Sequence, residues 1–375
     1  MRVAFAHHEP IDAAKARWVA IVRSLAAMAE VADVTWLTPD TAARTQAYAR
    51  DHLGLALPAA LRVQTLPSVH KLAGLTINHV FFRACGRALE KQPPDVLWLR
   101  SDKLAAHLAS RPPAPLVYEA HLVGPLWAAD NGRGERASKR LEQLERRLYG
   151  AASGVAAITQ GLLDEIRARY GYGGPAAVTP SAVDTAVFRP VFNAGGQTVV
   201  YVGTLQFWKG LSTLLEAMAL APGLRLRIVG GGDDHALRER AAALGIAGRV
   251  EITGRVPQTR IPALCADALC AVHPLPPEIS ISARFTSPLK LFEYMAMGLP
   301  IVAADVPSAR EVLNDGNARL YKAGDAAALA TALQQLAGDA ALAARLSQGG
   351  LATAQLHTYQ ARAKRLLDLF AQASG

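Results

Sequence analysis

Short apolar runs alternate with helix-like stretches along most of this chain, and this alternation restricts its fold more than any other feature. In the first half, five runs have the composition of buried strands: 2–6, 33–37, 95–99, 115–118 and 155–158. Strands that alternate with helices are joined by right-handed crossovers, and such connections build a parallel sheet covered by helices. The first half is therefore predicted to form a doubly wound α/β domain.

The same alternation restarts after a turn-forming stretch, Asn-Ala-Gly-Gly-Gln, at 193–197. Five more strands are expected at 198–202, 225–229, 250–252, 268–272 and 301–303. The chain has 375 residues, which exceeds the length at which one hydrophobic core stops growing. We therefore predict two Rossmann-like domains, 1–190 and 191–357, and a last helix, 358–375, that can pack across either of them. Ligands of such sheets bind beyond the carboxyl ends of the strands.

The composition narrows the classes of function. Hydrophobic residues make up 51% of the chain and charged residues 19%, as in globular proteins. No apolar run is long enough to span a bilayer, the first residues do not resemble a signal peptide, and three cysteines are too few for a disulfide framework. We therefore expect a cytoplasmic protein.

The net charge of +9 suits an anionic ligand or an anionic membrane surface. No nucleic-acid recognition motif accompanies it. Arg83, Arg87 and Lys91 recur on one face of a predicted helix that also carries Val80, Phe81 and Leu89. This basic stripe predicts peripheral contact with the membrane, although an ordinary solvated face explains it equally well.

The segment 285–304 carries the clearest chemistry. Ser287 followed by Pro288 is typical of a helix start, with Ser287 as the N-cap. The free amides of Leu289 and Lys290, the helix dipole and the Lys290 ammonium would then favour a diphosphate. Glu293 lies one turn further along and can accept hydrogen bonds from a ribose diol. A capped helix with an acidic residue is also a common structural feature.

Two glycine-containing turns follow strands of the second half. The segment 201–210 places Gly203 at a turn that permits close approach of the backbone, and Lys209 just before a helix, where it can neutralise a phosphate. An ordinary turn with an exposed lysine would look the same. The segment 228–234 has three glycines but not the GxGxxG spacing, so it does not indicate a dinucleotide site.

These three segments, with 250–256 and 307–312 in the same order, resemble the C-terminal domain of the family 4 retaining glycosyltransferases of GT-B fold. The segments 117–121 and 179–184 resemble the family's first domain and its interdomain segment. The resemblance implies two Rossmann-like domains facing a cleft. It also implies transfer of a sugar from a UDP- or GDP-sugar, with retention of configuration, to a glycan, a lipid-linked sugar or a small molecule in cell-envelope synthesis.

The resemblance also implies roles for individual residues. Lys209, beside Gly203 and Thr204, would hold the donor diphosphate, and Glu293 would hold the ribose. The amides after Pro288 would face the phosphates. Arg255 and Val256 would flank the base, and His121 would contact the transferred sugar. Cationic side chains and helix amides would replace a metal, so neither a metal nor a cofactor is expected.

Three departures from the family pattern affect these expectations. Phe285 stands where the family commonly has a first glutamate, Thr204 replaces a common arginine, and 7–12 replaces a glycine-rich loop. Because a phenyl ring cannot accept hydrogen bonds from a sugar, we expect Glu278 or an amide of its loop to do so; packing of Phe285 beneath the loop is the alternative. The departures leave two other functions open: a nucleotide-sugar epimerase or hydrolase, and a non-catalytic protein that binds nucleotide sugars.

Overall fold

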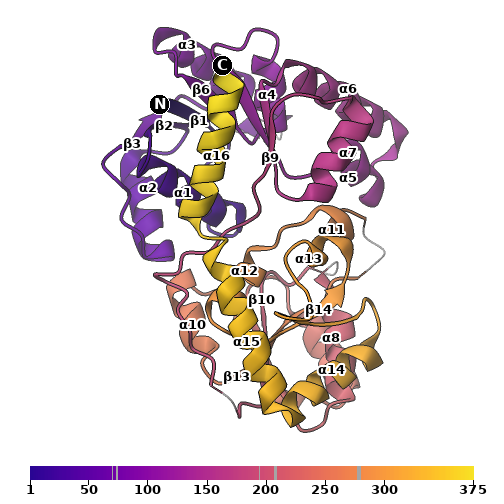
Figure 1. Ribbon diagram of the computed structural model, residues 1–375. Coiled ribbons are helices and arrows are strands. Elements are labelled where there is room, and N and C mark those ends of the chain that lie inside the picture. The colour runs from indigo at the N-terminus through magenta and orange to yellow at the C-terminus, as the bar shows by residue number, and fades with distance from the viewer. Residues whose placement is uncertain (70, 73–74, 194, 207–208, 277–279) are drawn as a thin grey trace. The chain divides into compact units, whose positions relative to one another are not determined.

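A computed structural model describes the whole chain except residues 70, 73–74, 194, 207–208 and 277–279. It divides into two compact units (Figure 1). Unit 1 comprises Met1–Pro180 and Tyr359–Gly375, and unit 2 comprises Ser181–Thr358. The predicted border at 190 differs from this division because residues 181–190 are tied into unit 2. Within that unit Ser181 forms two hydrogen bonds with Ser287, and Val183 pairs with Thr358.

Unit 1 is built on a seven-stranded sheet in the order β3-β2-β1-β6-β7-β8-β9, with every neighbouring pair parallel. The strands are β1 (Arg2–Ala6), β2 (Asp33–Thr38), β3 (Leu61–Thr65), β6 (Val96–Leu99), β7 (Leu116–Ala120), β8 (Gly154–Ala157) and β9 (Ala176–Val178). A separate antiparallel pair is formed by β4 (Lys71–Leu72) and β5 (Leu75–Thr76). The residues of β6, β7 and β8 are all buried, as expected for strands covered on both faces.

The helices of unit 1 connect these strands, and the last helix of the chain packs against the same sheet. They are α1 (Arg17–Ala29), α2 (Ala42–Tyr48), α3 (His79–Lys91), α4 (Asp102–Leu108), α5 (Gly124–Asp130), α6 (Gly134–Ala151), α7 (Gln160–Tyr170) and α16 (Tyr359–Ser374), with a π-helical turn at Ala49–Leu53. Figure 1 shows α16, in yellow, beside α1. Its Phe370 ring lies 5.9 Å from that of Trp98 on β6. The helix predicted at 358–375 therefore belongs to unit 1.

Unit 2 contains a six-stranded parallel sheet in the order β12-β11-β10-β13-β14-β15. Its strands are β10 (Thr198–Val202), β11 (Arg225–Val229), β12 (Val250–Ile252), β13 (Ala268–His273), β14 (Ile301–Asp305) and β15 (Arg319–Lys322). Its helices are α8 (Leu211–Ala219), α9 (His235–Ala243), α10 (Ile261–Leu264), α11 (Ser280–Phe285), α12 (Leu289–Ala296), α13 (Pro307–Arg310), α14 (Ala326–Gly338) and α15 (Ala340–Gln355). Two parallel α/β sheets confirm the predicted fold class.

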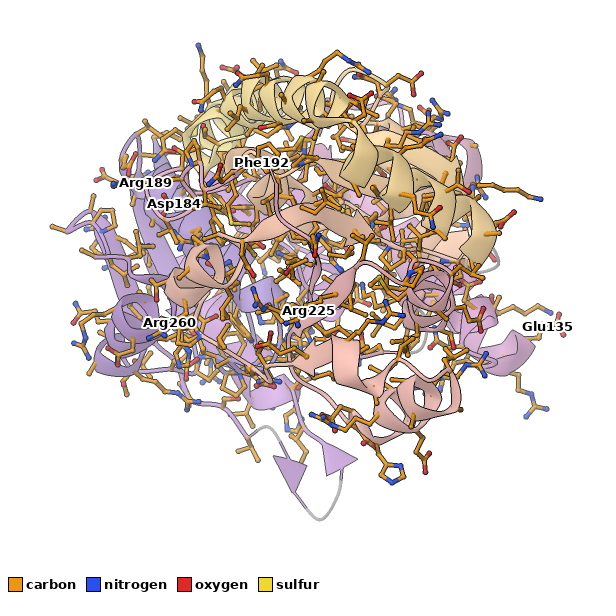
Figure 2. All side chains as sticks on the ribbon, turned by 90° about the horizontal axis from the view of Figure 1, so that it is seen from below. Glu135, Asp184, Arg189, Phe192, Arg225 and Arg260 are labelled. Atoms are coloured by element: carbon orange, nitrogen blue, oxygen red, sulfur yellow. The ribbon has the colours of Figure 1, made fainter. Side chains whose placement is uncertain are left out.

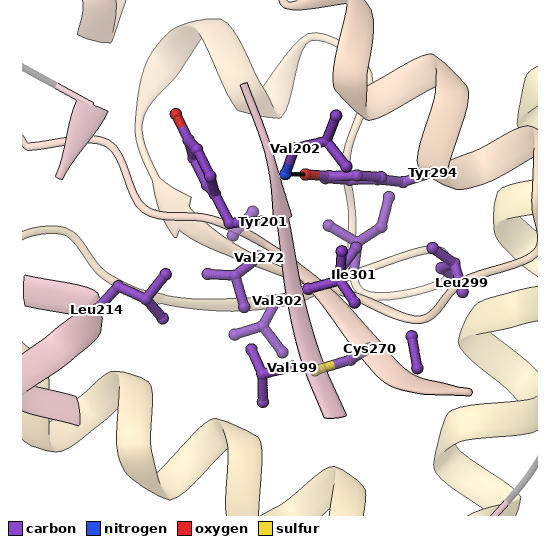
Figure 3. Close-up of a cluster of buried hydrophobic side chains, with 14 of the residues drawn as sticks. Val199, Tyr201, Val202, Leu214, Cys270, Val272, Tyr294, Leu299, Ile301 and Val302 are labelled. Atoms are coloured by element: carbon purple, nitrogen blue, oxygen red, sulfur yellow. Dashed lines mark hydrogen bonds between the residues drawn. The ribbon is translucent and has the colours of Figure 1, made fainter. Parts of the chain in front are cut away.

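One hydrogen bond fixes α12 to the central strand of unit 2. The paired register of β10 with β13 ends at Val200 and Ala271. Beyond it, the Val202 amide donates to the hydroxyl of the fully buried Tyr294 at 2.7 Å (Figure 3). Leaving this amide buried and unpaired would cost about 1–3 kcal/mol. The bond thus sets the position of α12, and with it of Lys290 and Glu293.

All ten strands expected from the sequence are present, with ends that differ by at most a few residues. The two-residue strands β4 and β5 were not expected, and neither were β3, β9 and β15. The last three are the edge strands of their sheets, where fewer buried apolar residues are needed, so their pattern is weak. Among the described residues, no helix combines the length and the apolar character that crossing a bilayer requires.

The helices α3 and α6 carry charged residues on the surface of unit 1. On α3, Arg83, Arg87 and Lys91 are exposed, but Phe81 and Leu89 are buried in the core. Phe81 and Leu89 are therefore unavailable to a membrane, whereas Val80 is half-buried, and the expectation is corrected to a mainly charged face. On α6, Glu135 points outward (Figure 2) and pairs with Lys139 at 2.7 Å, as in an ordinary solvated helix.

Candidate functional site

Two lysines, Lys290 and the half-buried Lys209, lie near the carboxyl end of the sheet in unit 2. Lys290, in the first turn of α12, is only 8% exposed, and its Nζ has no hydrogen-bond partner among the residues that the structure describes. Nζ lies 3.7 Å from the centroid of the Tyr201 ring, a cation–π distance. Burial, together with the charge of nearby Lys209, holds the pKa of Lys290 well below its usual range. A buried ammonium group without a hydrogen-bonding partner is costly, which indicates a place prepared for an anion.

Lys209 lies in the turn before α8, and burial lowers its pKa to about 8. The helix begins after Gly210, whose φ of +72° favours glycine and whose Cβ, if present, would overlap the Pro274 carbonyl oxygen. The turn is therefore pressed against the loop that follows β13. Lys209 and Lys290 are brought together by tertiary packing, since they are 81 positions apart in the sequence.

His273, the last residue of β13, completes what we call the lysine cluster: Lys209, Lys290 and His273. It is buried, and its Nδ1 has no partner within the described part of the chain. Burial and then the charges of Lys290 and Lys209 hold its pKa well below the usual value, so the ring is neutral. His273 was not identified from the sequence; its place at the carboxyl end of a central strand was the available signal.

Gly203 provides the close approach of the backbone predicted for it. Its φ is +151°, and an added Cβ would lie 3.0 Å from Lys290 Nζ and from the Tyr201 hydroxyl oxygen. Next to it, the Thr204 hydroxyl donates to Gln206 at 3.1 Å. The glycines at 230–232 pack against this turn, where a Cβ on Gly230 would overlap the Gly203 carbonyl oxygen. Close packing of two loops, rather than a dinucleotide, accounts for this glycine-rich stretch.

The start of α12 corrects the expected N-cap. The helix begins at Leu289 after Pro288, and the Ser287 side chain does not cap it. Ser287 Oγ instead accepts a hydrogen bond from the Ser181 amide at 2.9 Å, which joins this turn to the first residues of unit 2. The amides of Leu289 and Lys290 still open the helix beside the Lys290 side chain, so the predicted anion site does not depend on the cap.

Glu293 lies one turn after Lys290 and is 6% exposed. Its Oε1 accepts a hydrogen bond from Gln258 Nε2 at 2.7 Å. Gln258 was not identified from the sequence; it follows the predicted base-flanking residues Arg255 and Val256 at the end of the same loop. Arg255 is exposed, and a Cβ added to Gly231 would lie 3.1 Å from the Arg255 Cβ. The loop after β12 therefore reaches both the glycine-rich turn and Glu293.

The structure places Phe285 inside unit 2, with its side chain fully buried. The Arg284 guanidinium lies over the ring at 4.8 Å from its centroid. The burial of the ring supports the alternative stated for Phe285, that it packs inside the protein. Glu278, the expected replacement for the missing glutamate, lies outside the described residues.

In unit 1, Glu119 on β7 is almost completely buried at 2% exposure. Its Oε1 lies 2.6 Å from His121 Nε2, and its Oε2 accepts a hydrogen bond from the Trp98 indole at 3.0 Å. Arg100 Nη2 lies 3.3 Å from the other ring nitrogen of His121, Nδ1. Because a guanidinium group can only donate, Nδ1 must accept this bond and Nε2 must carry the proton.

This arrangement keeps His121 neutral. Burial and the charge of Arg100 lower its pKa to about 4, although Glu119 opposes the shift. Both ring nitrogens already have partners, so His121 is better suited to contact a ligand as a neutral, oriented ring than to act as a free base. His7 and Ser101 follow the adjacent strands β1 and β6, and place further polar groups at the same sheet edge.

The structure thus gathers Gly203, Lys209, Lys290 and Glu293 in unit 2, and it builds a separate polar cluster around His121 in unit 1. No group of three or more His, Cys, Asp or Glu side chains suited to a metal ion occurs among the described residues. The roles predicted for the individual site residues stay predictions.

Comparisons with known proteins cover both units. The profile of the family described as Glycosyltransferase Family 4 matches residues 18–187, and that of Glycosyl transferases group 1 matches residues 196–339. A phosphatidyl-myo-inositol mannosyltransferase of Mycobacterium leprae is 33% identical over 185 residues, which are 47% of this chain and 46% of the relative. A D-inositol 3-phosphate glycosyltransferase of Acidothermus cellulolyticus is 29% identical over 308 residues, covering 74% of this chain and 66% of the relative. The chain spans about half the length of several curated relatives that it matches.

Solved structures share the fold over nearly the whole chain. Sucrose-phosphate synthase from Thermosynechococcus elongatus superposes with a TM-score of 0.79 at 20% identity, covering 99% of this chain and 98% of the other. Anabaena HepE in complex with UDP-glucose gives a TM-score of 0.72 at 19% identity, covering 99% of each chain. At these identities the likeness establishes the fold and nothing further.

Proposed function

Because the chain belongs to the family 4, group 1 glycosyltransferases of GT-B fold, we propose that it transfers a sugar from a nucleoside diphosphate donor to a cell-envelope acceptor. The observation that carries this proposal is the buried Lys290 ammonium group, which interacts electrostatically with Lys209 and has no hydrogen-bond partner among the described residues. Two cations beside a helix start match the two negative charges of a diphosphate.

The proposed chemistry follows from the charge that develops during transfer. As the glycosidic bond to the donor breaks, the sugar becomes oxocarbenium-like and the leaving diphosphate gains negative charge. Lys209, Lys290 and the amides of Leu289 and Lys290 stabilise that charge. The neutral His121 ring contacts the transferred sugar, and the leaving phosphate accepts the acceptor's proton on the same face, with retention of configuration.

We propose a UDP-sugar as the donor and a lipid-linked sugar or glycan as the acceptor. The donor is supported by HepE, whose solved structures contain UDP and UDP-glucose. The acceptor is supported by relatives named as a phosphatidyl-myo-inositol mannosyltransferase and a lipopolysaccharide core glycosyltransferase. Incubation of labelled UDP- and GDP-sugars with a cell-envelope lipid extract tests both choices. Label in the lipid fraction supports transfer, whereas release of free sugar without acceptor or binding without turnover would contradict it.

Transfer is expected to survive chelation, because lysines and helix amides supply the positive charge at the diphosphate. The labelled-donor assay is run in EDTA, then with added magnesium or manganese. Equal rates in all three conditions are expected. Activity that is lost in EDTA and restored by a divalent cation would refute metal-independent stabilisation.

Glu293→Gln is expected to weaken donor and free UDP by similar factors, because the ribose is present in both. Loss of a charged acceptor costs about 1.5–3 kcal/mol, which corresponds to roughly a ten- to hundredfold change in Kd. Isothermal titration calorimetry with UDP measures the change. Glu311→Gln, an exposed glutamate of the same unit, serves as control. Unchanged UDP affinity in Glu293→Gln would remove Glu293 from the nucleotide site.

The exposed residues Arg83, Arg87 and Lys91 on α3 support a weaker proposal, contact with anionic lipid headgroups. Basic side chains near such a surface contribute about 1 kcal/mol each. The triple alanine variant is therefore expected to lose most sedimentation with phosphatidylglycerol vesicles in low salt. Equal sedimentation of wild type and variant, or no preference for anionic over neutral vesicles, would contradict the contact.

A further inference from the structure

The carboxylate that holds His121 is also bound by the last helix of the chain. Arg362, on α16, is 5% exposed, and its Nη2 lies 2.8 Å from Glu119 Oε1. The same oxygen lies 2.6 Å from His121 Nε2. Arg100 Nη1 lies 3.9 Å from this oxygen as well. One buried oxygen is therefore shared by the histidine and by a guanidinium group that arrives from the far end of the sequence.

Arg362 is fixed in place by its remaining nitrogens. Nη1 donates to Ser24 Oγ on α1 at 3.1 Å, and Nε donates to the Pro180 carbonyl oxygen at 3.2 Å. All three nitrogens of the guanidinium group thus have acceptors, all of them within unit 1. Such a planar, fully bonded group orients a carboxylate more strictly than a point charge does.

The charges around Glu119 show what Arg362 contributes. Burial by itself would raise the pKa of this carboxyl group. Arg362, His121 and Arg100 together reverse the effect and hold the pKa well below its usual range. Without Arg362, the carboxylate would lose its nearest formal cation in a buried site, where ionisation is expensive. A protonated Glu119 would accept the bond from His121 Nε2–H more weakly, and a reoriented one would not offer Oε1 to it.

We propose that Arg362 is a positioning residue for His121: through Glu119 it holds the imidazole in the Nε2–H form and in the orientation that presents the ring to the donor sugar. The presentation of the ring to the donor sugar rests on the proposed function, whereas the tautomer and orientation of His121 do not. Catalytic geometry in unit 1 would then depend on α16, so the last helix would contribute to the reaction as well as to the core.

The test compares Arg362→Met and Arg362→Lys with a control on the same helix, Lys364→Met, whose side chain is exposed. The first readout is nitrogen-15 NMR of the histidine side chains, with the His121 signals assigned by their absence in His121→Gln. Wild type and Lys364→Met should show protonated Nε2 and unprotonated Nδ1. Arg362→Met should show exchange between the two tautomers. Arg362→Lys keeps the positive charge but lacks the planar guanidinium group, so it should restore the wild-type pattern in part.

The second readout is steady-state kinetics. A misplaced catalytic group can cost on the order of 100-fold in rate, so kcat of Arg362→Met should fall by about that factor, with little change in KM for the donor or in UDP affinity. Recovery of part of kcat in Arg362→Lys is expected. An unchanged tautomer and kcat in Arg362→Met would overturn the proposal.

The two readouts also separate the possible failures. If Arg362→Met does not fold, the tautomer of the wild-type protein and of Arg362→Lys decides: an Nδ1–H form of His121 in the wild type would overturn the arrangement. If the tautomer responds as expected but no protein transfers sugar, the proposed function fails and the positioning contact stands.

Discussion

Replacement of Lys290 by methionine is expected to raise the melting temperature of the ligand-free protein while removing most of its affinity for UDP. Methionine fills a similar volume without a polar head, and the Lys290 ammonium is buried without a hydrogen-bond partner among the described residues. Removing a buried, unpaired polar group should raise the free energy of unfolding by on the order of 1–3 kcal/mol. Each kcal/mol raises Tm by about 2–4 °C in a domain of this size. A site prepared for a ligand thus costs stability when it is empty.

The same substitution is expected to weaken the binding of UDP. A charged hydrogen bond to the diphosphate is worth about 1.5–3 kcal/mol, so the Kd for UDP should rise roughly ten- to hundredfold. Scanning calorimetry with and without UDP measures both effects in one experiment. Lys322→Met, an exposed lysine of the same unit, should change neither. A lower Tm with unchanged UDP binding would mean that Lys290 is a structural residue.

Lys209→Ala is expected to reduce kcat by about 30- to 1000-fold at saturating donor. The estimate corresponds to the roughly 2–4 kcal/mol lost when one group that stabilises developing charge is removed. Lys322→Ala is the matched control. Wild-type turnover in Lys209→Ala, measured with saturating donor, would show that the lysine does not face the leaving phosphate.

The pH dependence gives Lys209 a second test. Burial lowers its pKa to about 8 in the ligand-free protein. As the pH rises through 8 the ammonium group loses its proton and its charge, so kcat/KM, which reports the free enzyme, should fall on the alkaline side. Lys209→Arg keeps a cation at every accessible pH and should shift this fall to higher pH. An identical alkaline limb in both proteins would assign it to another group.

Regular patterns were sufficient to predict the main strands, the fold class and part of the candidate site. The strands 2–6 and 198–202 were predicted with the bounds that the structure has, because buried parallel strands are continuous apolar runs. Lys290 and Glu293 were predicted to share the first turns of one helix, since their spacing is local. Gly203 was predicted because its backbone conformation depends on a single residue.

Tertiary structure decided the rest, because each remaining feature joins residues that are far apart in the chain. Ser287 has the local pattern of an N-cap, but its hydroxyl oxygen instead accepts a hydrogen bond from the Ser181 amide. His273 and Gln258 belong to the site only because packing brings their strand and loop to α12. Arg362 reaches Glu119 from the last helix, across 243 positions of sequence. Local preferences determine which elements form, whereas the partners of a buried polar group depend on how those elements pack.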